Sequence, residues 1–165
     1  MSAPMQRLIL LRHGEAEANA PSGRDLDRAL TAAGAAAVSR TAKALAAAGA
    51  TPDLALVSAS TRTRETWQVA KASFPQSRAE FMPEIYHAGV AALLALANES
   101  GAETVMLVGH NPSIQGLALD LLARNDGDRA AMARVESRFP PATAAVFVFE
   151  GGAPRLETLL MGGQV

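Results

Sequence analysis

The sequence predicts an α/β protein, a three-layer α/β/α sandwich with a mostly parallel central sheet. Short β-rich runs alternate along the chain with segments of helical periodicity, which is typical of a sheet covered by helices on both faces. The 165 residues, of which 49% are hydrophobic, suit one globular domain with a substantial core. We therefore expect a single domain over residues 1–165.

The first half of this pattern contains two strand and helix pairs. "RLILL" at 7–11 predicts a central strand, and the apolar spacing after it predicts a helix that Thr31 caps and Gly49 ends. "DLALVS" at 53–58 predicts the next strand, and "TRTRETWQVAKASF", which follows it, predicts the next helix. This order gives a β-α-β-α unit.

A brief strand is expected within 79–86, closed by Pro83, with a helix over about 89–98 behind it. The segment 103–122 then predicts another strand, a turn and a helix, with Asn111 as the N-cap and Pro112 in the first helical position.

The last third predicts two strands, "TAAVFVFE" at 143–150 and "PRLETLLM" at 154–161. The glycine pair 151–152 between them is a turn signal, so these strands should form a hairpin. No internal repeat or linker interrupts the chain.

Composition excludes several classes of function. A net charge of -1 and an isoelectric point near 6.3 provide no large basic surface, so neither nucleic acid nor a membrane is expected as a partner. The absence of cysteine excludes disulfides and thiol nucleophiles, and it favours the cytoplasm. No apolar run is long enough to span a bilayer. The serine-hydrolase elbow, the P-loop and the dinucleotide fingerprint are also missing.

Two histidines occupy equivalent places in the pattern. His13 and His110 each follow a strand directly, and each lies in a turn that contains glycine. If their strands are parallel neighbours, both imidazoles lie at the carboxyl edge of the sheet, where α/β proteins bind ligands. Arg12 precedes His13, and Arg62 opens the helix after another strand that ends at this edge. Two guanidinium groups and two imidazoles at helix N-termini favour a phosphoryl group as ligand.

Two other interpretations compete with a phosphate site. Glu15 lies near His13 and suggests metal binding, but the adjacent arginines would repel a divalent cation and no third histidine has ligand spacing. We therefore expect neither a metal nor a cofactor. The other interpretation is purely structural, with each histidine capping its strand end through a backbone hydrogen bond.

Three motifs resemble those of the histidine phosphatase superfamily, the phosphoglycerate mutase-like proteins. "LRHGEAEAN" is similar to the block that carries that family's nucleophilic histidine. "SASTRTRET" is similar to its second block, and its spacing selects Arg62 over Arg64. "VMLVGHNPSI" is similar to the third block, a strand that ends in the second histidine. The short length and "DLDRALTAAG" at 25–34 look most like the small bacterial phosphohistidine phosphatases of the SixA type.

The resemblance implies a phosphoglycerate mutase-like fold and a covalent mechanism. His13 would attack phosphorus and become phosphohistidine, which water then hydrolyses. Arg12, Arg62 and His110 would hold the phosphoryl oxygens. Asn19 matches an asparagine that contacts phosphate in mutase-like members, whereas Ala16 stands where those members often carry Ser or Thr.

The general acid is the least defined part of the predicted site. Glu84 in "MPEIY" matches the position of the family's acidic glutamate, although a solvated loop carboxylate would have the same sequence. Glu17 and Asp27, in the loop after the nucleophile, are the alternatives. Arg24 or Arg28 in the same loop could line the mouth of the pocket.

We therefore predict a metal-independent phosphatase that acts on phosphohistidine in a protein. A small-molecule phosphomonoesterase or a mutase-like enzyme is the alternative, and a phosphate-binding module without turnover is the alternative from another class. The expected partner is a phosphorylated protein or a small phosphorylated metabolite. The sequence does not predict an oligomeric state.

Overall fold

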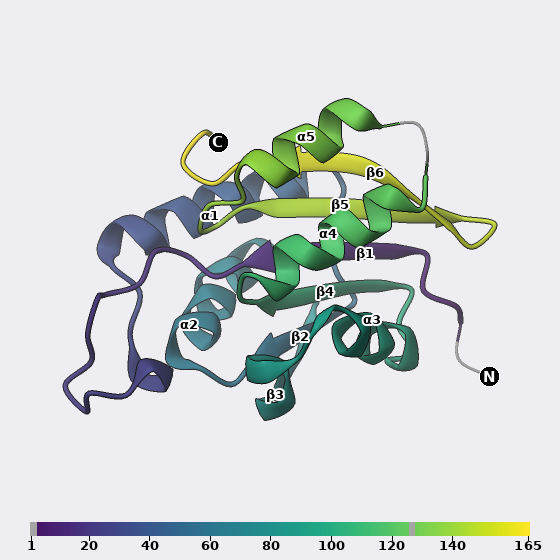
Figure 1. The fold of residues 1–165 in the computed structure, drawn as a ribbon. Helices are drawn as coiled ribbons and strands as arrows, with labels where there is room; N and C mark the ends of the chain where they lie inside the picture. The colour runs from purple at the N-terminus through teal and green to yellow at the C-terminus, as the bar shows by residue number, and fades with distance from the viewer. Residues whose placement is uncertain (1–2, 126–127) are drawn as a thin grey trace.

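A mixed sheet forms the centre of the molecule in a computed structural model, which describes residues 3–125 and 128–165 (Figure 1). Its strands are β1 (Arg7–Arg12), β2 (Leu54–Ser58), β3 (Arg78–Met82), β4 (Thr104–Gly109), β5 (Ala144–Glu150) and β6 (Ala153–Leu160). Their order across the sheet is β3-β2-β4-β1-β5-β6. The first four strands in this order run parallel, while β5 and β6 form an antiparallel hairpin at one edge.

Helices cover both faces of the sheet. The α-helices are α1 (Ala32–Ala47), α2 (Thr61–Ala70), α3 (Val90–Glu99), α4 (Ser113–Ala123) and α5 (Arg129–Ser137). Three short 3₁₀ turns are η1 (Asp25–Asp27), η2 (Lys71–Ser73) and η3 (Pro83–His87). Helices α3, α4 and α5 pack on one face, and α1 and α2 pack on the other (Figure 1). This arrangement confirms the predicted three-layer sandwich.

The alternation of side chains along β1 explains how one strand supports two cores. Leu8 and Leu10 are fully buried under α4 and its neighbours, while Ile9 and Leu11 are fully buried under α1 and α2. A strand that is buried on both faces carries a continuous apolar run, as "LILL" does. The apolar run ends at Arg12, which is the last residue of β1 and lies at the carboxyl end of the strand.

The parallel arrangement brings the carboxyl ends of β1, β2 and β4 together at one end of the sheet. Strand β4 lies between β1 and β2 and is parallel to both, with Arg12 of β1 level with Gly109 of β4. His13 and His110 follow these two paired residues, so they leave the sheet side by side. Strand β2 ends at Ser58, and the chain turns there into α2.

Side-chain caps begin two of the predicted helices where the sequence placed them. The Thr31 hydroxyl accepts a hydrogen bond from the backbone N–H of Gly34 at 2.9 Å, and the Ser60 hydroxyl accepts one from the N–H of Thr63. Gly49, with φ of 76°, ends the first of these segments in the left-handed conformation that glycine adopts readily.

One predicted helix start was wrong by one position, and one helix was not predicted. Helix α4 begins at Ser113 and takes Pro112 as its cap, although Asn111 still accepts a hydrogen bond from the N–H of Gln115 at 3.2 Å. Within 79–86 the strand ends at Met82 and Pro83 begins η3, as predicted for a brief strand closed by that proline. Helix α5 was not predicted, because it carries two arginines and buries only two side chains.

None of the helices in the described ranges has both the length and the hydropathy that crossing a bilayer requires.

Candidate active site

The His13 ring lies directly after β1 and is 7% exposed. Its Nδ1 is 2.7 Å from the carbonyl oxygen of Gly14. A carbonyl only accepts, so Nδ1 must carry the proton and the lone pair must lie on Nε2. Arg62 Nε donates to that Nε2 at 3.3 Å. The hydrogen bonds thus orient the ring and leave Nε2 as its nucleophilic atom.

Close packing explains why glycine follows this histidine. A Cβ on Gly14 would lie 2.8 Å from the carbonyl oxygen of Gly34 and 2.8 Å from a methyl group of Val38, both on α1. The N–H of Gly14 also donates to the Thr66 hydroxyl of α2 at 3.1 Å. Only a residue without a side chain can bring the His13 turn this close to both helices.

Arg62 is buried in the first turn of α2 and has a partner on every nitrogen of its guanidinium group. Besides the contact of Nε with His13, Nη1 donates to the backbone carbonyl of Asp25 at 2.9 Å and Nη2 donates to the Asp25 carboxylate at 3.0 Å. These bonds hold the planar group against the imidazole in a defined orientation.

Arg12 and His110 complete the cluster. The two imidazole centroids lie 5.4 Å apart. Arg12 Nη1 donates to the carbonyl of Phe139 at 2.8 Å, and His110 Nε2 bonds to the Ser58 hydroxyl at 2.8 Å. The structure thus brings together all four residues that the sequence predicted as the centre of the site.

Two buried nitrogens in this cluster have no partner among the described residues, Arg12 Nε and His110 Nδ1. A buried polar atom without a hydrogen bond is costly, and such atoms are rare in folded proteins. A bound oxyanion would satisfy a donor on each of these groups. This is an independent indication that the cluster accommodates a ligand.

Burial governs the ionisation of both histidines. It lowers the pKa of His13 to about 4, helped by the nearby positive charge of Arg62. Burial also lowers the pKa of His110 to about 3, with further contributions from His13 and Arg62. Both rings are therefore neutral at pH 7, and His13 keeps the lone pair that a nucleophile needs.

The same pKa values predict how stability changes with pH. Each histidine has a lower pKa in the folded protein than the ordinary value of 6.5, so the unfolded chain binds more protons below pH 6.5. We expect the free energy of unfolding to fall as the pH is lowered from 6.5 to 4, by up to about 1.4 kcal/mol per pH unit for each histidine.

Urea denaturation at several pH values measures this slope. His13→Ala should reduce it, whereas His87→Ala, which removes an exposed imidazole on η3, should leave it unchanged. An equal slope in the wild type and in His13→Ala would show that His13 does not titrate with a depressed pKa.

Among the described residues, none of the predicted acids makes a hydrogen bond with His13 or His110. Glu84 is exposed on η3, and within the described ranges it makes no hydrogen bond or ion pair. Glu17 is also exposed, and its hydrogen bonds are made by its backbone, whose carbonyl accepts from Arg28 at 2.9 Å and whose N–H donates to the carbonyl of Ala29 at 2.8 Å. The Asp27 carboxylate accepts from the Ser22 hydroxyl at 2.7 Å and lies 3.9 Å from Arg24.

Asn19 lies outside the cluster of buried residues. It is exposed in the loop after His13, where it lines an open hollow of about 360 Å³ together with Arg24, Asp25 and Arg28. Arg24 and Arg28 were the two arginines considered for the mouth of the pocket. The loop thus forms a polar depression in which these side chains meet.

Asp25 contacts Arg62 and Tyr86 contacts His110, and the sequence predicted neither contact. The Asp25 carboxylate accepts from Arg62 Nη2, from the Tyr86 hydroxyl and from Arg28 Nε. The bond from Tyr86, with the charge of Arg62, lowers the pKa of Asp25 to about 2 and raises that of Tyr86. The Tyr86 ring stands edge-on to His110, with centroids 5.4 Å apart. No motif marks either residue, because the loop and η3 meet only in the folded chain.

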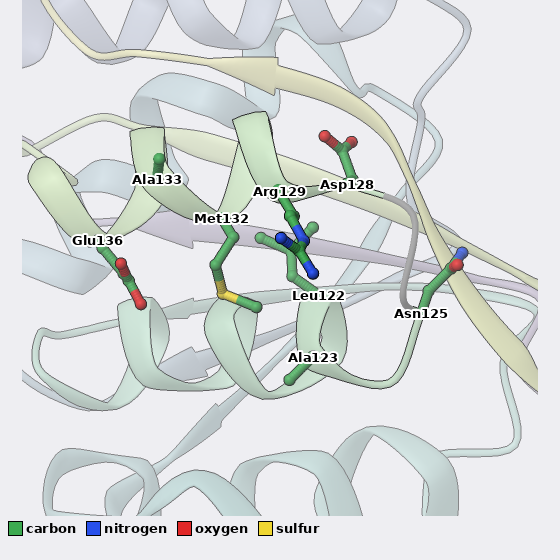
Figure 2. Close-up of a pocket in the computed structure, with 8 residues that line it drawn as sticks. All are labelled: Leu122, Ala123, Asn125, Asp128, Arg129, Met132, Ala133 and Glu136. Atoms are coloured by element: carbon green, nitrogen blue, oxygen red, sulfur yellow. The ribbon is translucent and has the colours of Figure 1, made fainter.

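A separate hollow of about 620 Å³ lies between α4 and α5 (Figure 2). Met132 and Leu122 contribute its apolar part, and Arg129, Asp128 and Glu136 its charged part. It contains none of the predicted site residues. Across residues 3–125 and 128–165, no group of three His, Asp or Glu side chains is placed to hold a metal ion.

Comparison with known proteins agrees with this geometry. The model of the histidine phosphatase superfamily (branch 1) matches residues 8–85, which include His13 and Arg62. Among curated proteins, an uncharacterised chloroplastic protein of Arabidopsis thaliana is 33% identical over 120 residues, or 64% of this chain. The chain spans about half the length, 54%, of that relative.

Solved structures extend the similarity over nearly the whole chain. The Agrobacterium tumefaciens protein assigned as the phosphohistidine phosphatase SixA is 33% identical, with a TM-score of 0.84 over 96% of this chain and 99% of that one. A second protein with this assignment, from Nakamurella multipartita, is 28% identical, with a TM-score of 0.81 over 99% of each chain. A phosphoglycerate mutase from Plasmodium falciparum, 18% identical over 94% of this chain and 91% of its own with a TM-score of 0.61, shares the fold.

Proposed function

This chain belongs to the histidine phosphatase superfamily, and we propose that it is a metal-independent phosphatase in which His13 carries the phosphoryl group. One observation carries the proposal. Nε2 of the buried His13 holds the lone pair and faces Arg62 at 3.3 Å, while Arg12 and His110 present buried nitrogens that have no partner among the described residues. A neutral nucleophile surrounded by anion-binding groups suits phosphoryl transfer.

The first step follows from this arrangement. Nε2 of His13 attacks phosphorus in line, the new P–N bond forms, and the bond to the leaving group breaks with its electron pair going to the leaving group. Arg12, Arg62 and His110 bind the equatorial oxygens, where charge is spread in the transition state. The hydrogen bond from Nδ1 to Gly14 stabilises the ring as it becomes positive.

In the second step water attacks the phosphorus of the phosphohistidine, in line with the P–N bond. The P–N bond breaks, its electron pair returns to Nε2, and inorganic phosphate leaves after losing a proton to solvent. Because burial lowers the pKa of His13 to about 4, the ring is a weak base and a good leaving group in this step.

We propose phosphohistidine on a protein as the substrate. The two relatives assigned as SixA phosphohistidine phosphatases support this choice, since they match this chain over nearly its full length. Between Arg62 and Glu84 the chain forms only the rest of α2, η2, β3 and the start of η3, so no long insertion covers the site there. A shallow site binds a small metabolite weakly but admits a side chain that projects from another protein.

A panel of substrates tests this function. The purified protein is offered a phosphohistidine protein, 3-phosphoglycerate, a sugar phosphate and an aryl phosphate, each with and without a chelator. We expect hydrolysis to continue in the presence of the chelator, and we expect the phosphohistidine protein to have the highest kcat/KM. A higher kcat/KM for one metabolite would favour the alternative of a small-molecule phosphomonoesterase or mutase-like enzyme. Stoichiometric phosphate binding with no hydrolysis at all would favour a phosphate-binding module.

We expect Glu84→Gln to have a small effect on substrates with good leaving groups. An exposed carboxylate without contacts can act only by delivering a proton to the departing oxygen. The kcat of an alkyl phosphate should therefore fall about tenfold or more, while that of an aryl phosphate should stay within about twofold. Steady-state kinetics on both substrates measure the difference.

Glu80→Gln, which changes another exposed carboxylate on β3, is the matched control and should affect neither substrate. Equal losses of the two rates in Glu84→Gln would remove Glu84 as the acid and leave Glu17 or Asp27 as candidates.

A further inference from the structure

Asp25 holds the outer edge of the Arg62 guanidinium. Its backbone carbonyl accepts from Nη1 and its carboxylate accepts from Nη2, at 2.9 and 3.0 Å. A guanidinium has five N–H donors, so the inner edge, made of Nε–H and the second Nη2–H, remains directed to the side of His13. That edge is the one a phosphoryl group on His13 would use. Asp25 and a phosphoryl group can therefore bind Arg62 at the same time.

The carboxylate of Asp25 also lies on the side of the site that is open to solvent. Its side chain is 53% exposed, whereas that of Arg62 is 7% exposed, so Asp25 lies on the solvent side of the arginine. Asp25 belongs to the loop that lines the open hollow with Arg28, and Arg28 and Tyr86 hold its two oxygens. A leaving group departs on the side of phosphorus opposite His13, which is the open side of this site.

We propose that Asp25 is a specificity-determining residue, whose carboxylate binds the free N–H of a phosphorylated imidazole and repels substrates that carry a second anionic group, such as a carboxylate, beside the phosphate. The inference rests on the proposed phosphatase function and names the feature that selects its substrate class. The positive groups that face Asp25 are Arg62 and Arg28, and Tyr86 adds a neutral donor. A carboxylate so held is ionised throughout the physiological range.

This contact also removes the need for a general acid. A phosphorylated imidazole has phosphorus on one nitrogen and can carry a proton on the other. A carboxylate beside that second nitrogen favours its protonated form. When Nε2 of His13 forms its bond to phosphorus, the P–N bond of the substrate breaks and the electron pair stays on the substrate nitrogen. The leaving group departs as neutral imidazole, with the proton that it already carried.

Substrates that carry a second negative charge beside the phosphate are disfavoured by Asp25. A phosphoglycerate carries a carboxylate near its phosphate, and that charge would approach Asp25 in the same depression. Two like charges a few ångströms apart disfavour binding, and the effect is larger near a low-dielectric surface than in bulk water. Asp25 therefore discriminates by the charge that the rest of the substrate carries beside its phosphate, whereas Arg62 binds the phosphoryl group that all these substrates share.

The test compares three probes in the wild type and in Asp25→Asn: N-phosphoimidazole, 4-nitrophenyl phosphate and 3-phosphoglycerate. We expect kcat/KM for N-phosphoimidazole to fall about 10- to 100-fold in Asp25→Asn, as for loss of a charge-assisted hydrogen bond. The aryl phosphate should change less, and 3-phosphoglycerate should be hydrolysed as well as before or better. Tyr86→Phe, which removes one donor to the carboxylate, should shift the ratio of the first probe to the third in the same direction by a smaller factor.

Asp120→Asn removes an equal charge on α4, where Asp120 pairs with Arg124 at 2.9 Å, and it should leave all three values unchanged. Equal losses for the three probes in Asp25→Asn would mean that Asp25 only positions Arg62, and would overturn the inference. Wild-type protein that hydrolyses none of the probes would instead overturn the proposed function itself. Circular dichroism of each variant confirms that the exposed substitution leaves the fold intact.

Discussion

His13→Ala should abolish turnover, with a fall in kcat of at least about 10⁴-fold on any phosphorylated substrate. The variant removes the only atom that the proposed mechanism uses to accept phosphorus. The fold should survive, because the His13 side chain packs at a strand end and its hydrogen bonds go to one carbonyl and one arginine. Hydrolysis of 4-nitrophenyl phosphate measures the rate, and circular dichroism measures the fold.

His87→Ala is the matched control, since His87 is an exposed imidazole on η3 near the same end of the molecule. It should keep the wild-type rate within about twofold. Turnover by His13→Ala at a tenth of the wild-type rate or more would exclude a covalent intermediate on this residue.

Arg62→Lys should weaken the binding of vanadate at least about 100-fold. Vanadate adopts the trigonal-bipyramidal geometry of phosphoryl transfer, so it reports how well the site fits the transition state. A lysine ammonium is a point charge, and it cannot bond His13, the Asp25 carbonyl and the Asp25 carboxylate at once as the guanidinium does. The inhibition constant for vanadate in the aryl phosphate assay gives the measurement.

Arg64→Lys tests the specificity of that effect. Arg64 is exposed on the same helix, where its Nε donates to the carbonyl of Ala59 at 2.8 Å. The vanadate constant should change by less than about threefold. A similar loss of vanadate affinity in both variants would indicate a general effect of charge. If the wild type bound vanadate no more tightly than phosphate, that result would argue against a phosphoryl-transfer site.

The centre of the site was predictable because parallel strands share an edge. His13 and His110 each follow a buried run directly, and Arg62 lies at the start of the helix after a third run; the positions of those runs in the sequence indicate three strands of one sheet. The register of β1 against β4, with Arg12 level with Gly109, then places the two imidazoles together. No knowledge of the loops was needed for this part.

The contacts around the centre depend on loops, whose paths leave no periodic pattern. Asp25 reaches Arg62 because η1 folds back over α2, and Tyr86 reaches Asp25 because β3 ends in η3. The carbonyl of Phe139 that binds Arg12 follows α5, a helix too polar for its periodicity to be recognised. Backbone groups are invisible to motif analysis, since every residue carries them.

The predicted acid shows the converse limit. A positional match to a motif predicts Glu84 as the acid, whereas sequence position does not specify exposure. In the fold Glu84 lies in solvent on η3, while Tyr86, two residues further along the same turn, contacts His110 and Asp25. The short 3₁₀ turn after Met82 brings Tyr86 against His110.

The most direct test of the account is chemical identification of the phosphorylated residue during turnover. The enzyme is mixed with N-phosphoimidazole or an aryl phosphate, quenched in alkali within the first turnovers and digested for mass spectrometry. We predict a phosphoryl group on the peptide that contains His13, stable in alkali, lost in acid and absent from His13→Ala. Steady hydrolysis with no phosphorylated peptide, or with phosphate on His110 in place of His13, would contradict the proposed mechanism.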